Sequence, residues 1–202
     1  MIKNIIFDFG DVFINLDKPA TLTELSKLGE INDWKDLTKV NQLYETGEIS
    51  TEEFLQHYHN EFPNATKEQL IDAWNAILID FPEYRLDFLE ELSSKQEFNL
   101  ILLSNTNALH INWIKENISF YNRFKSCFKS FYLSHEIHLR KPNTNIFEFV
   151  LEQHQIQPSE TIFIDDTKEN TDAAFSLGIH VWNNNPKTED ITNLFTIKSN
   201  LF

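Results

Sequence analysis

An aspartate stands at the end of the first apolar run of the chain. Residues 3–17 read KNIIFDFGDVFINLD, so the apolar residues IIF lead directly to Asp8, and Gly10 follows two residues later. Parallel α/β sheets bind ligands outside the carboxyl ends of their strands, and a carboxylate at this point is well placed to act on one. It can attack as a nucleophile and form a covalent acyl phosphate. On these residues alone, a nucleophile and a turn-forming aspartate are equally good interpretations.

Three further segments carry polar side chains that suit the same chemistry. They read LILLSNTN at 100–107, LRKP at 139–142 and TIFIDDTKENTD at 161–172. The first is an apolar run that ends in Ser104 and Asn105, the second offers Lys141, and the third ends in Asp165 and Asp166. Adjacent carboxylates repel each other, which raises the pKa of one of them unless a cation is bound. The order along the chain is therefore acid, hydroxyl, lysine and acid pair.

This order resembles the four motifs of the haloacid dehalogenase superfamily of hydrolases, and the resemblance covers nearly the whole chain. Within that superfamily, the chain is similar to the small phosphatases that carry a helical cap inserted after the first motif. The strings GEIS, LSNTN and RKP are similar to those of bacterial sugar-phosphate phosphatases of the glucose-1-phosphatase type. The resemblance implies a phosphoric monoester hydrolase that depends on Mg²⁺. Its substrate would be a small phosphorylated metabolite, with sugar phosphates among the candidates.

The resemblance also implies a nucleophile and a metal site. Asp8 would attack phosphorus and become an aspartyl phosphate. Mg²⁺ would be bound by Asp8, by Asp166 and by the backbone carbonyl of Gly10, and a hard cation of this kind prefers such oxygen ligands. Asp165 would lie further from the metal and orient a metal-bound water.

The remaining motif residues are expected to hold the phosphate. Ser104 and Asn105, with backbone N–H groups at the start of the helix that follows, would bind the transferring group. Lys141 would neutralise phosphate charge and pair with the nucleophile. Arg140 and Asn170 lie close to these motifs, and for each a functional role and a plain surface position are equally good interpretations.

The first motif departs from the usual pattern of the superfamily, DxDx(T/V), in which the second aspartate is a general acid/base. Gly10 stands at that position, so no side chain there can protonate a leaving oxygen. General acid/base catalysis typically contributes about 10²–10⁴-fold. The similar sugar-phosphate phosphatases also carry glycine, and a good leaving group such as an anomeric phosphate needs less help. Asp11, one residue further on, is a candidate substitute.

Two other functions stay open. A 2-haloacid dehalogenase uses the same nucleophile without metal and tolerates Gly10, but it has no use for the pair Asp165 and Asp166. A degenerate member of the superfamily would bind a phosphorylated ligand or a protein partner without turnover. Activity that survives EDTA favours the dehalogenase, whereas failure to release phosphate from p-nitrophenyl phosphate favours the degenerate protein.

The elements that must position these residues follow from the hydrophobic pattern. Short apolar runs predict strands near 3–8, 99–103, 129–133, 161–165 and 179–182. None of them alternates apolar with polar residues, which is typical of strands buried on both faces of a parallel sheet. Helical spacing appears at 84–95, 143–154 and 168–177. The alternation of strand and helix predicts a doubly wound, Rossmann-like parallel α/β core.

Residues 18–80 interrupt this alternation, because they show helical spacing and contain no strand-like run. Ser50 is expected to cap a helix that starts at the next residue. The simplest account is a small α-helical cap inserted into the core. The predicted domains are a discontinuous α/β core of residues 1–14 and 85–202 and a helical cap of residues 15–84.

The cap is expected to select the substrate. Tyr44, Glu45 and Trp74 are candidates to line the pocket, although an aromatic residue on a helix more often packs in a core. His110, His135 and His138 show no metal-ligand spacing, and we expect them to pack or to lie on the surface.

Composition narrows the class of partner. The chain has 202 residues, of which 17 are Lys or Arg and 31 are Asp or Glu, and its formal net charge is −14. Such a chain repels nucleic acid and anionic membranes, and we expect neither as a partner. A phosphorylated substrate can approach only where a cation reverses the local field.

The cellular setting is predicted from three further features. No apolar run reaches the ~20 residues of a membrane span, and the first strand begins too early for a signal peptide. The single cysteine, Cys127, cannot form an intrachain disulfide and is expected to be a buried thiol. Together these features predict a cytoplasmic enzyme, either a monomer or a homodimer.

Overall fold

The computed structural model describes residues 1–31 and 34–202. In this part of the chain, five parallel strands form one sheet in the order β3-β2-β1-β4-β5. The strands are β1 (Asn4–Phe7), β2 (Asn99–Ser104), β3 (Ser130–Leu133), β4 (Thr161–Asp165) and β5 (His180–Asn183). Each predicted strand is confirmed to within one residue, and the predicted parallel α/β core is confirmed with them.

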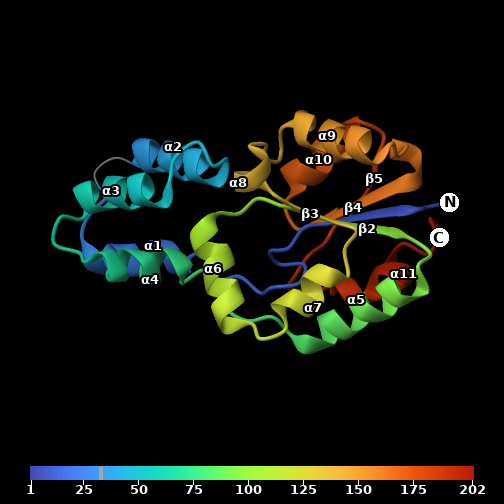
Figure 1. Cartoon of the computed structure of the whole chain (residues 1–202), viewed down its shortest axis with the longest axis horizontal. Helices are drawn as coiled ribbons and strands as arrows, with labels where there is room; N and C mark the ends of the chain where they lie inside the picture. The colour runs from blue at the N-terminus through green and yellow to red at the C-terminus, as the bar shows by residue number, and fades with distance from the viewer. Residues whose placement is uncertain (32–33) are drawn as a thin grey trace.

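Helices cover both faces of the sheet (Figure 1). On one face lie α9 (Thr144–His154) and α10 (Lys168–Ser176), and on the other α5 (Glu83–Lys95), α7 (Tyr121–Ser126) and α11 (Leu194–Ile197). The connections contain α6 (Ala108–Asn117), α8 (Ser134–Ile137), η1 (Pro158–Glu160) and η2 (Ile191–Asn193). Among the described residues, no helix combines the length and the apolar character that a membrane span requires.

Successive side chains of β1 enter different hydrophobic layers. Ile6 packs with residues of α9 and α10, whereas Ile5 and Phe7 pack with residues of α5, α7 and α11. All three side chains are fully buried. Because side chains alternate across a strand, burial on both faces requires a continuous apolar sequence, and this is why the strands could be recognised as unbroken apolar runs.

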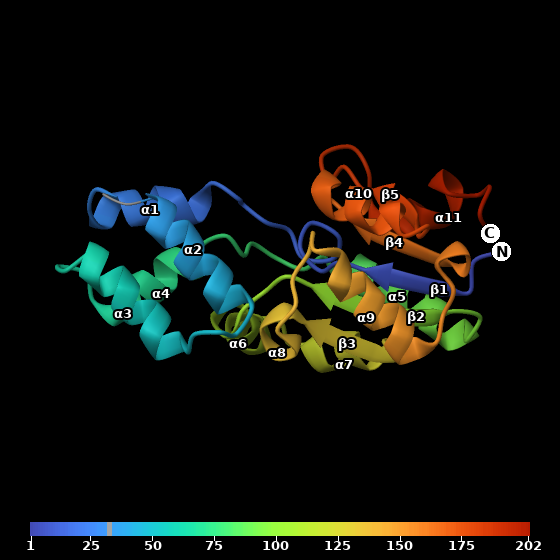
Figure 2. The same ribbon diagram turned by 90° about the horizontal axis from the view of Figure 1, so that it is seen from above.

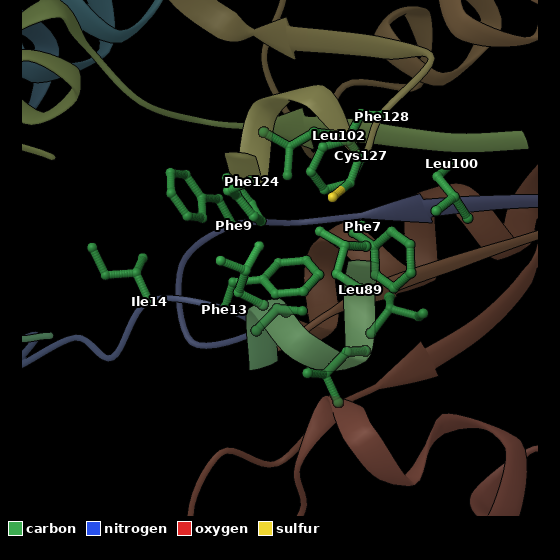
Figure 3. Close-up of a cluster of buried hydrophobic side chains, with 14 of the residues drawn as sticks. Phe7, Phe9, Phe13, Ile14, Leu89, Leu100, Leu102, Phe124, Cys127 and Phe128 are labelled. Carbon is green, nitrogen blue, oxygen red and sulfur yellow. The ribbon is translucent and has the colours of Figure 1, made fainter. Parts of the chain in front are cut away.

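An aromatic cluster under the sheet anchors the loop after β1 (Figure 3). Phe9 stacks on Phe124 with ring centroids 4.8 Å apart, and Phe13 meets the same ring at 5.1 Å. Cys127 is buried beside them, as predicted, and burial raises the pKa of its thiol to about 11. Since Phe9 and Phe13 flank the segment that contains Gly10 and Asp11, their packing fixes the course of this loop.

A second group of helices lies beyond the carboxyl ends of the strands (Figures 1 and 2). It contains α1 (Ala20–Leu28), α2 (Trp34–Glu45), α3 (Thr51–Glu61) and α4 (Lys67–Asn75). Its own core is centred on Phe54, whose ring lies 4.2 Å from Tyr44 and 4.8 Å from Trp74. The predicted cap at Ser50 is confirmed, because its hydroxyl accepts from the N–H of Glu53 and the Glu53 carboxylate accepts from the N–H of Ser50.

Two adjacent segments connect this helical bundle to the sheet. The N–H of Asn15 donates to the carbonyl of Asp80 at 2.8 Å, and Leu16 and Leu78 form an antiparallel bridge. We call these two paired segments, which contain Asn15 and Leu16 on one side and Leu78 and Asp80 on the other, the linker ribbon. Arg85 binds next to it, since its Nη1 donates to the carbonyl of Phe13 at 3.1 Å. The predicted domain boundaries at 14/15 and 84/85 fall beside this ribbon and remain predictions.

Candidate active site

Three carboxylates meet at the carboxyl ends of β1 and β4. Asp8 follows the last residue of β1, Asp165 is the last residue of β4, and Asp166 comes next. One oxygen from each of the three lies within 4.8 Å of the others. The N–H of Asp8 donates to the carbonyl of Ile164 at 2.9 Å, which joins the two strand ends. Residues far apart in the sequence are thus brought to one edge of the sheet.

Lys141 lies between two of these carboxylates. Its Nζ is 2.8 Å from Oδ1 of Asp8 and 2.6 Å from Oδ2 of Asp165, and its side chain is fully buried. Burial alone would lower the pKa of Lys141, but attraction to Asp165 and Asp8 outweighs it, so the pKa lies above its ordinary value. The lysine therefore keeps its positive charge, and its predicted pairing with Asp8 is present.

The electrostatic state of Asp8 depends on its neighbours. Burial raises the pKa of Asp8 to about 7, Lys141 opposes this rise, and the negative charge of Asp165 adds to it. The anion is the form that attacks, and a further positive charge close to Asp8 would stabilise that form.

Asp165 is a fully buried hub of hydrogen bonds. Besides Lys141, it accepts from the N–H of Thr167 at 2.7 Å and from Nδ2 of Asn170 at 3.0 Å. Both carboxylate oxygens are engaged in this way. Asp165 thereby ties Lys141 to the first turn of α10, and this arrangement supports its predicted position outside the direct metal ligands. The side chain of Asn170 belongs to the same network rather than to the surface.

Lys18 adds a cation that was not predicted from the sequence. Its Nζ contacts Oδ2 of Asp166 and lies 3.1 Å from Oδ2 of Asp11. Burial raises the pKa of Asp166, and Lys18 opposes this rise. The one signal in the sequence was that Lys18 is the first cationic residue after the first motif. Because Lys18 and Asp166 are far apart in the sequence, this contact could not be predicted from it.

The donor atoms at this strand edge fit a hard divalent cation. In the part of the chain that the structure describes, Oδ2 of Asp8 and Oδ1 of Asp166 accept no protein hydrogen bond. Two such oxygens, joined by waters and substrate oxygens, are the ligands that Mg²⁺ prefers. Asp8 and Asp166 would hold the ion, and the contribution of the Gly10 carbonyl remains a prediction.

Ser104 is the last residue of β2, and Asn105 follows it at the same edge of the sheet. Nδ2 of Asn105 donates to the carbonyl of Lys141 at 2.8 Å, and Oδ1 accepts from the N–H of Lys141 at 2.9 Å. One N–H of Nδ2 and the Oδ1 atom bind the backbone of Lys141, so Asn105 positions the lysine, and the second N–H of Nδ2 stays available to a ligand in the cleft that Asn105 lines. The hydroxyl of Ser104 makes only a long 3.5 Å contact with the carbonyl of Asn105 among the described residues. Its predicted contact with phosphate therefore stays open.

The helix that follows Ser104 and Asn105 is α6. It starts at Ala108, and Asn107 caps it by accepting from the N–H of His110. The side chain of Asn107 satisfies an N–H at the helix start, whereas that of Asn105 is turned toward Lys141.

Gly10 is restricted by a neighbouring side chain rather than by its backbone. Its φ lies outside the left-handed region, but a Cβ added at this position would stand 2.8 Å from Cδ1 of Leu16. The nearby Asp11 has a φ of +52° and accepts from the N–H of Leu16 at 3.1 Å. Since its other oxygen pairs with Lys18, the Asp11 carboxylate serves the loop. This makes it a poor substitute for an acid at position 10.

A cleft of about 390 Å³ opens beside these groups. Its lining includes Asp8, Lys18, Arg140, Lys141, Asp166 and Asn170. The cleft brings acidic and basic side chains to one space, which suits an anionic ligand that binds together with a cation.

The candidate residues of the cap have different surroundings. Tyr44 and Trp74 lie in the core of the helical bundle, and both contact the start of α6. The hydroxyl of Tyr44 accepts from the N–H of Leu109, and Nε1 of Trp74 donates to Oδ1 of Asn107. Both thus take the core position that was the alternative to lining the pocket. Glu45 faces the α/β body, where it pairs with Nη2 of Arg140 at 2.9 Å.

The three histidines agree with the packing or surface positions expected of them. His110 stacks on the indole ring of Trp74 with centroids 5.3 Å apart. His138 is exposed, and its Nδ1 lies 2.8 Å from the carbonyl of Thr46. His135 is partly buried within α8.

Comparisons with known proteins agree with this geometry. A family model described as haloacid dehalogenase-like hydrolase matches residues 5–183. A D-ribitol-5-phosphate phosphatase from Bacteroides thetaiotaomicron is 30% identical over 190 residues, which cover 90% of this chain and 91% of that protein.

Two solved structures are similar over nearly the whole chain. A HAD family enzyme from Bacteroides thetaiotaomicron, in complex with magnesium and inorganic phosphate, superposes with a TM-score of 0.85 at 34% identity and covers 96% of this chain and 100% of its own. A predicted HAD-like hydrolase from Porphyromonas gingivalis reaches a TM-score of 0.82 at 29% identity, and the match covers 98% of this chain and 97% of that one.

Proposed function

The chain belongs to the haloacid dehalogenase-like hydrolase family, and we propose that it is a Mg²⁺-dependent phosphatase of a small phosphorylated metabolite, acting through an aspartyl phosphate at Asp8. The observation that carries this proposal is the position of Lys141, which is buried between Asp8 and Asp165 and lines a cleft that Asp166 also lines. A nucleophile, a fixed positive charge and a site for a cation are thereby combined.

The proposed reaction has two steps. A carboxylate oxygen of Asp8 forms a bond to phosphorus while the bond from phosphorus to the alcohol oxygen breaks, and the departing oxygen takes up a proton from solvent water. Water then attacks the phosphorus of the acyl phosphate and gives up a proton to solvent, while the bond from phosphorus to the Asp8 oxygen breaks, which frees the Asp8 carboxylate and inorganic phosphate. Lys141 offsets the charge on the transferring group in both steps. Bound Mg²⁺ supplies further neutralisation of that charge.

The nature of the substrate is proposed from the relative. Since a protein that shares 30% of its residues is named a D-ribitol-5-phosphate phosphatase, we infer that polyol and sugar phosphates are the class to test first. A screen that includes pentitol, pentose and hexose phosphates together with nucleotides would identify the substrate.

Replacing the nucleophile tests the covalent role. Asp8→Asn should abolish phosphate release while the circular dichroism spectrum stays unchanged, because an amide does not attack phosphorus. The matched control is Asp72→Asn, at an exposed position of α4, and it should keep full activity. Retention of more than a few per cent of activity by Asp8→Asn, a loss below about 3 kcal/mol in the barrier, would contradict the proposal.

The metal site is tested by binding, independently of turnover. Titration calorimetry with MgCl₂ should show heat of binding for the unmodified protein and for the exposed control Asp172→Asn, and none for Asp166→Ala. Affinity that survives in Asp166→Ala would place the ion elsewhere. Turnover that persists in EDTA would argue instead for a reaction without metal.

A further inference from the structure

A second, smaller cavity adjoins the cleft on the side of the helical bundle. Its volume is about 130 Å³, and it shares Gly10, Leu16 and Asn105 with the cleft that contains Asp8. Glu45 of the bundle and Ser104 at the end of β2 line it together. Since the phosphate group is expected near Asp8 and Lys141, this cavity lies where the alcohol part of an ester would extend.

Most of the cavity wall is apolar, and it comes from the linker ribbon and from α6. Leu16, Ile77, Leu78 and Ile114 contribute to it. Such a wall packs against carbon atoms of a ligand and leaves recognition to the few polar groups present.

His110 lines the cavity but has no capacity left for a ligand. Its Nε2 lies 3.2 Å from the carbonyl of Trp74, and its Nδ1 lies 3.1 Å from Nδ2 of Asn107. Both ring nitrogens are therefore used within the protein, one as donor and one as acceptor. Burial also lowers the pKa of His110 to about 4, so the ring is neutral.

Glu45 differs from His110, because half of its carboxylate is unused. Oε2 accepts from Nη2 of Arg140 at 2.9 Å, whereas Oε1 has no partner among the described residues. Burial raises the pKa of Glu45 and Arg140 opposes this rise. The carboxylate thus offers a hydrogen-bond acceptor in a chamber whose wall is mostly apolar.

We propose that Glu45 is a specificity-determining residue, which accepts a hydrogen bond from a hydroxyl group of the leaving alcohol and so selects small hydroxylated phosphate esters. This inference rests on the proposed phosphatase function. The volume supports it, because about 130 Å³ is far below the ~300–1,000 Å³ of sites that enclose drug-sized ligands. A short polyol chain suits such a space, and a nucleoside does not.

The Glu45 side chain is 25% exposed, so a bound ester would displace the water that otherwise pairs with its free oxygen. A site that is built to hydrogen-bond a substrate hydroxyl discriminates strongly against an analogue without it, since the protein group is then left unpaired. Wild-type protein should therefore prefer ribitol 5-phosphate to pentyl phosphate, which has the same number of carbon atoms and no hydroxyl groups.

The main competing explanation is a purely mechanical one. The pair Glu45–Arg140 joins α2 to the segment before Lys141, and its loss could loosen the bundle without any contact to substrate. A mechanical role would affect every ester equally. A recognition role affects only esters that carry hydroxyl groups.

The experiment compares kcat and KM for ribitol 5-phosphate and pentyl phosphate in four proteins. Glu45→Ala should lose at least about tenfold in kcat/KM on ribitol 5-phosphate, mainly through KM, and less than about twofold on pentyl phosphate. Glu45→Gln keeps an acceptor but not the ion pair, and it should recover most of the preference. Glu48→Ala removes an exposed acid from the same turn, outside this cavity, and should behave as wild type.

Each other outcome is decisive. Equal losses on both esters, with Glu45→Gln as impaired as Glu45→Ala, would overturn recognition in favour of the mechanical role. Unchanged constants in Glu45→Ala would show that Glu45 does not contact the alcohol. Wild-type protein that releases phosphate from neither these esters nor p-nitrophenyl phosphate would overturn the proposed function, and the inference with it.

Discussion

Individual side chains at the site are placed by charge more than by shape. Lys141 is fully buried, and it is stable there because Asp8 and Asp165 lie within 3 Å of its ammonium group. Taking ions out of water is costly, and removal of one partner leaves a buried charge without compensation. The buried charges of the site therefore lower the stability of the fold whenever one partner is removed, besides serving the proposed reaction.

Asp165 should matter for stability at least as much as for catalysis. Asp165→Ala leaves Lys141 with one carboxylate and removes the acceptor for Thr167 and Asn170. We expect a loss of about 3–5 kcal/mol in the free energy of unfolding, measured by urea titration. The control Asp172→Ala removes an exposed pair with Lys168 and should cost less than about 0.5 kcal/mol. A similar small loss in Asp165→Ala would show that the buried network is not needed for folding.

The contact between Gly10 and Leu16 gives a second prediction at this scale. Gly10→Ala should destabilise the protein by at most about 1 kcal/mol, because the new methyl group would stand 2.8 Å from Cδ1 of Leu16, the end of a flexible side chain that can shift at small cost. In a Leu16→Ala background, the same change should cost much less. A double-mutant cycle of unfolding free energies measures this coupling. Additive effects would mean that Leu16 moves aside freely.

Secondary-structure elements were the part of the fold that could be predicted most fully. The apolar runs before Asp8 and Asp165 identify strands because strands buried on both faces need continuous apolar sequence. Ser50 could be recognised as a cap from the residues that follow it. These features are local, so a short window of sequence contains the whole signal.

Contacts between elements were beyond the reach of the sequence pattern. Lys18 meets Asp166 across 148 positions, and Glu45 meets Arg140 across 95. Such pairs depend on where the linker ribbon and α2 lie relative to the sheet, and the hydrophobic periodicity of a segment does not predict that position. The place of Leu16 over Gly10 was hidden for the same reason.

His110 of α6 attaches the bundle to the α/β body through Trp74 of α4. Its folded-state pKa of about 4 lies below the ordinary value of 6.5, so the unfolded chain binds more protons between these values. The contribution of His110 to stability is therefore complete above about pH 6.5 and is lost as the pH falls toward about 4.

Urea titrations near pH 7 and pH 5 should reveal this dependence. We expect the fall in unfolding free energy between them to be about 2 kcal/mol smaller in His110→Phe than in wild type. The exposed His57→Phe is the control and should keep the wild-type fall. An identical fall in His110→Phe would show that His110 is not held neutral in the folded protein.

The molecule as a whole repels the substrate that its site is proposed to bind. Its formal net charge is −14, whereas the cations Lys18, Arg140 and Lys141 gather at one cleft. Salt screens exposed charges over about 10 Å at 0.1 M ionic strength and over about 30 Å at 0.01 M. Long-range repulsion should thus weaken before the local attraction does.

We expect kcat/KM on a phosphate ester to rise as KCl increases from about 10 mM to about 150 mM, by less than about tenfold. Mg²⁺ is kept saturating, and choline chloride replaces KCl in a parallel series to separate screening from specific ion binding. A steady fall with salt would mean that the local cations, rather than the net charge, govern the encounter.

The linker ribbon has a consequence for how the helical bundle and the sheet could be combined during evolution. Because Asn15 and Asp80 are hydrogen-bonded neighbours, the helical bundle leaves and rejoins the sheet at one point, and its length adds little to the cost of closing that loop. Segments whose ends meet in this way tolerate insertion and replacement. An ancestral hydrolase could therefore acquire, lose or exchange a bundle here while its sheet and its buried lysine stayed unaltered. The exchange would also replace Glu45, the residue proposed to accept a hydrogen bond from the alcohol.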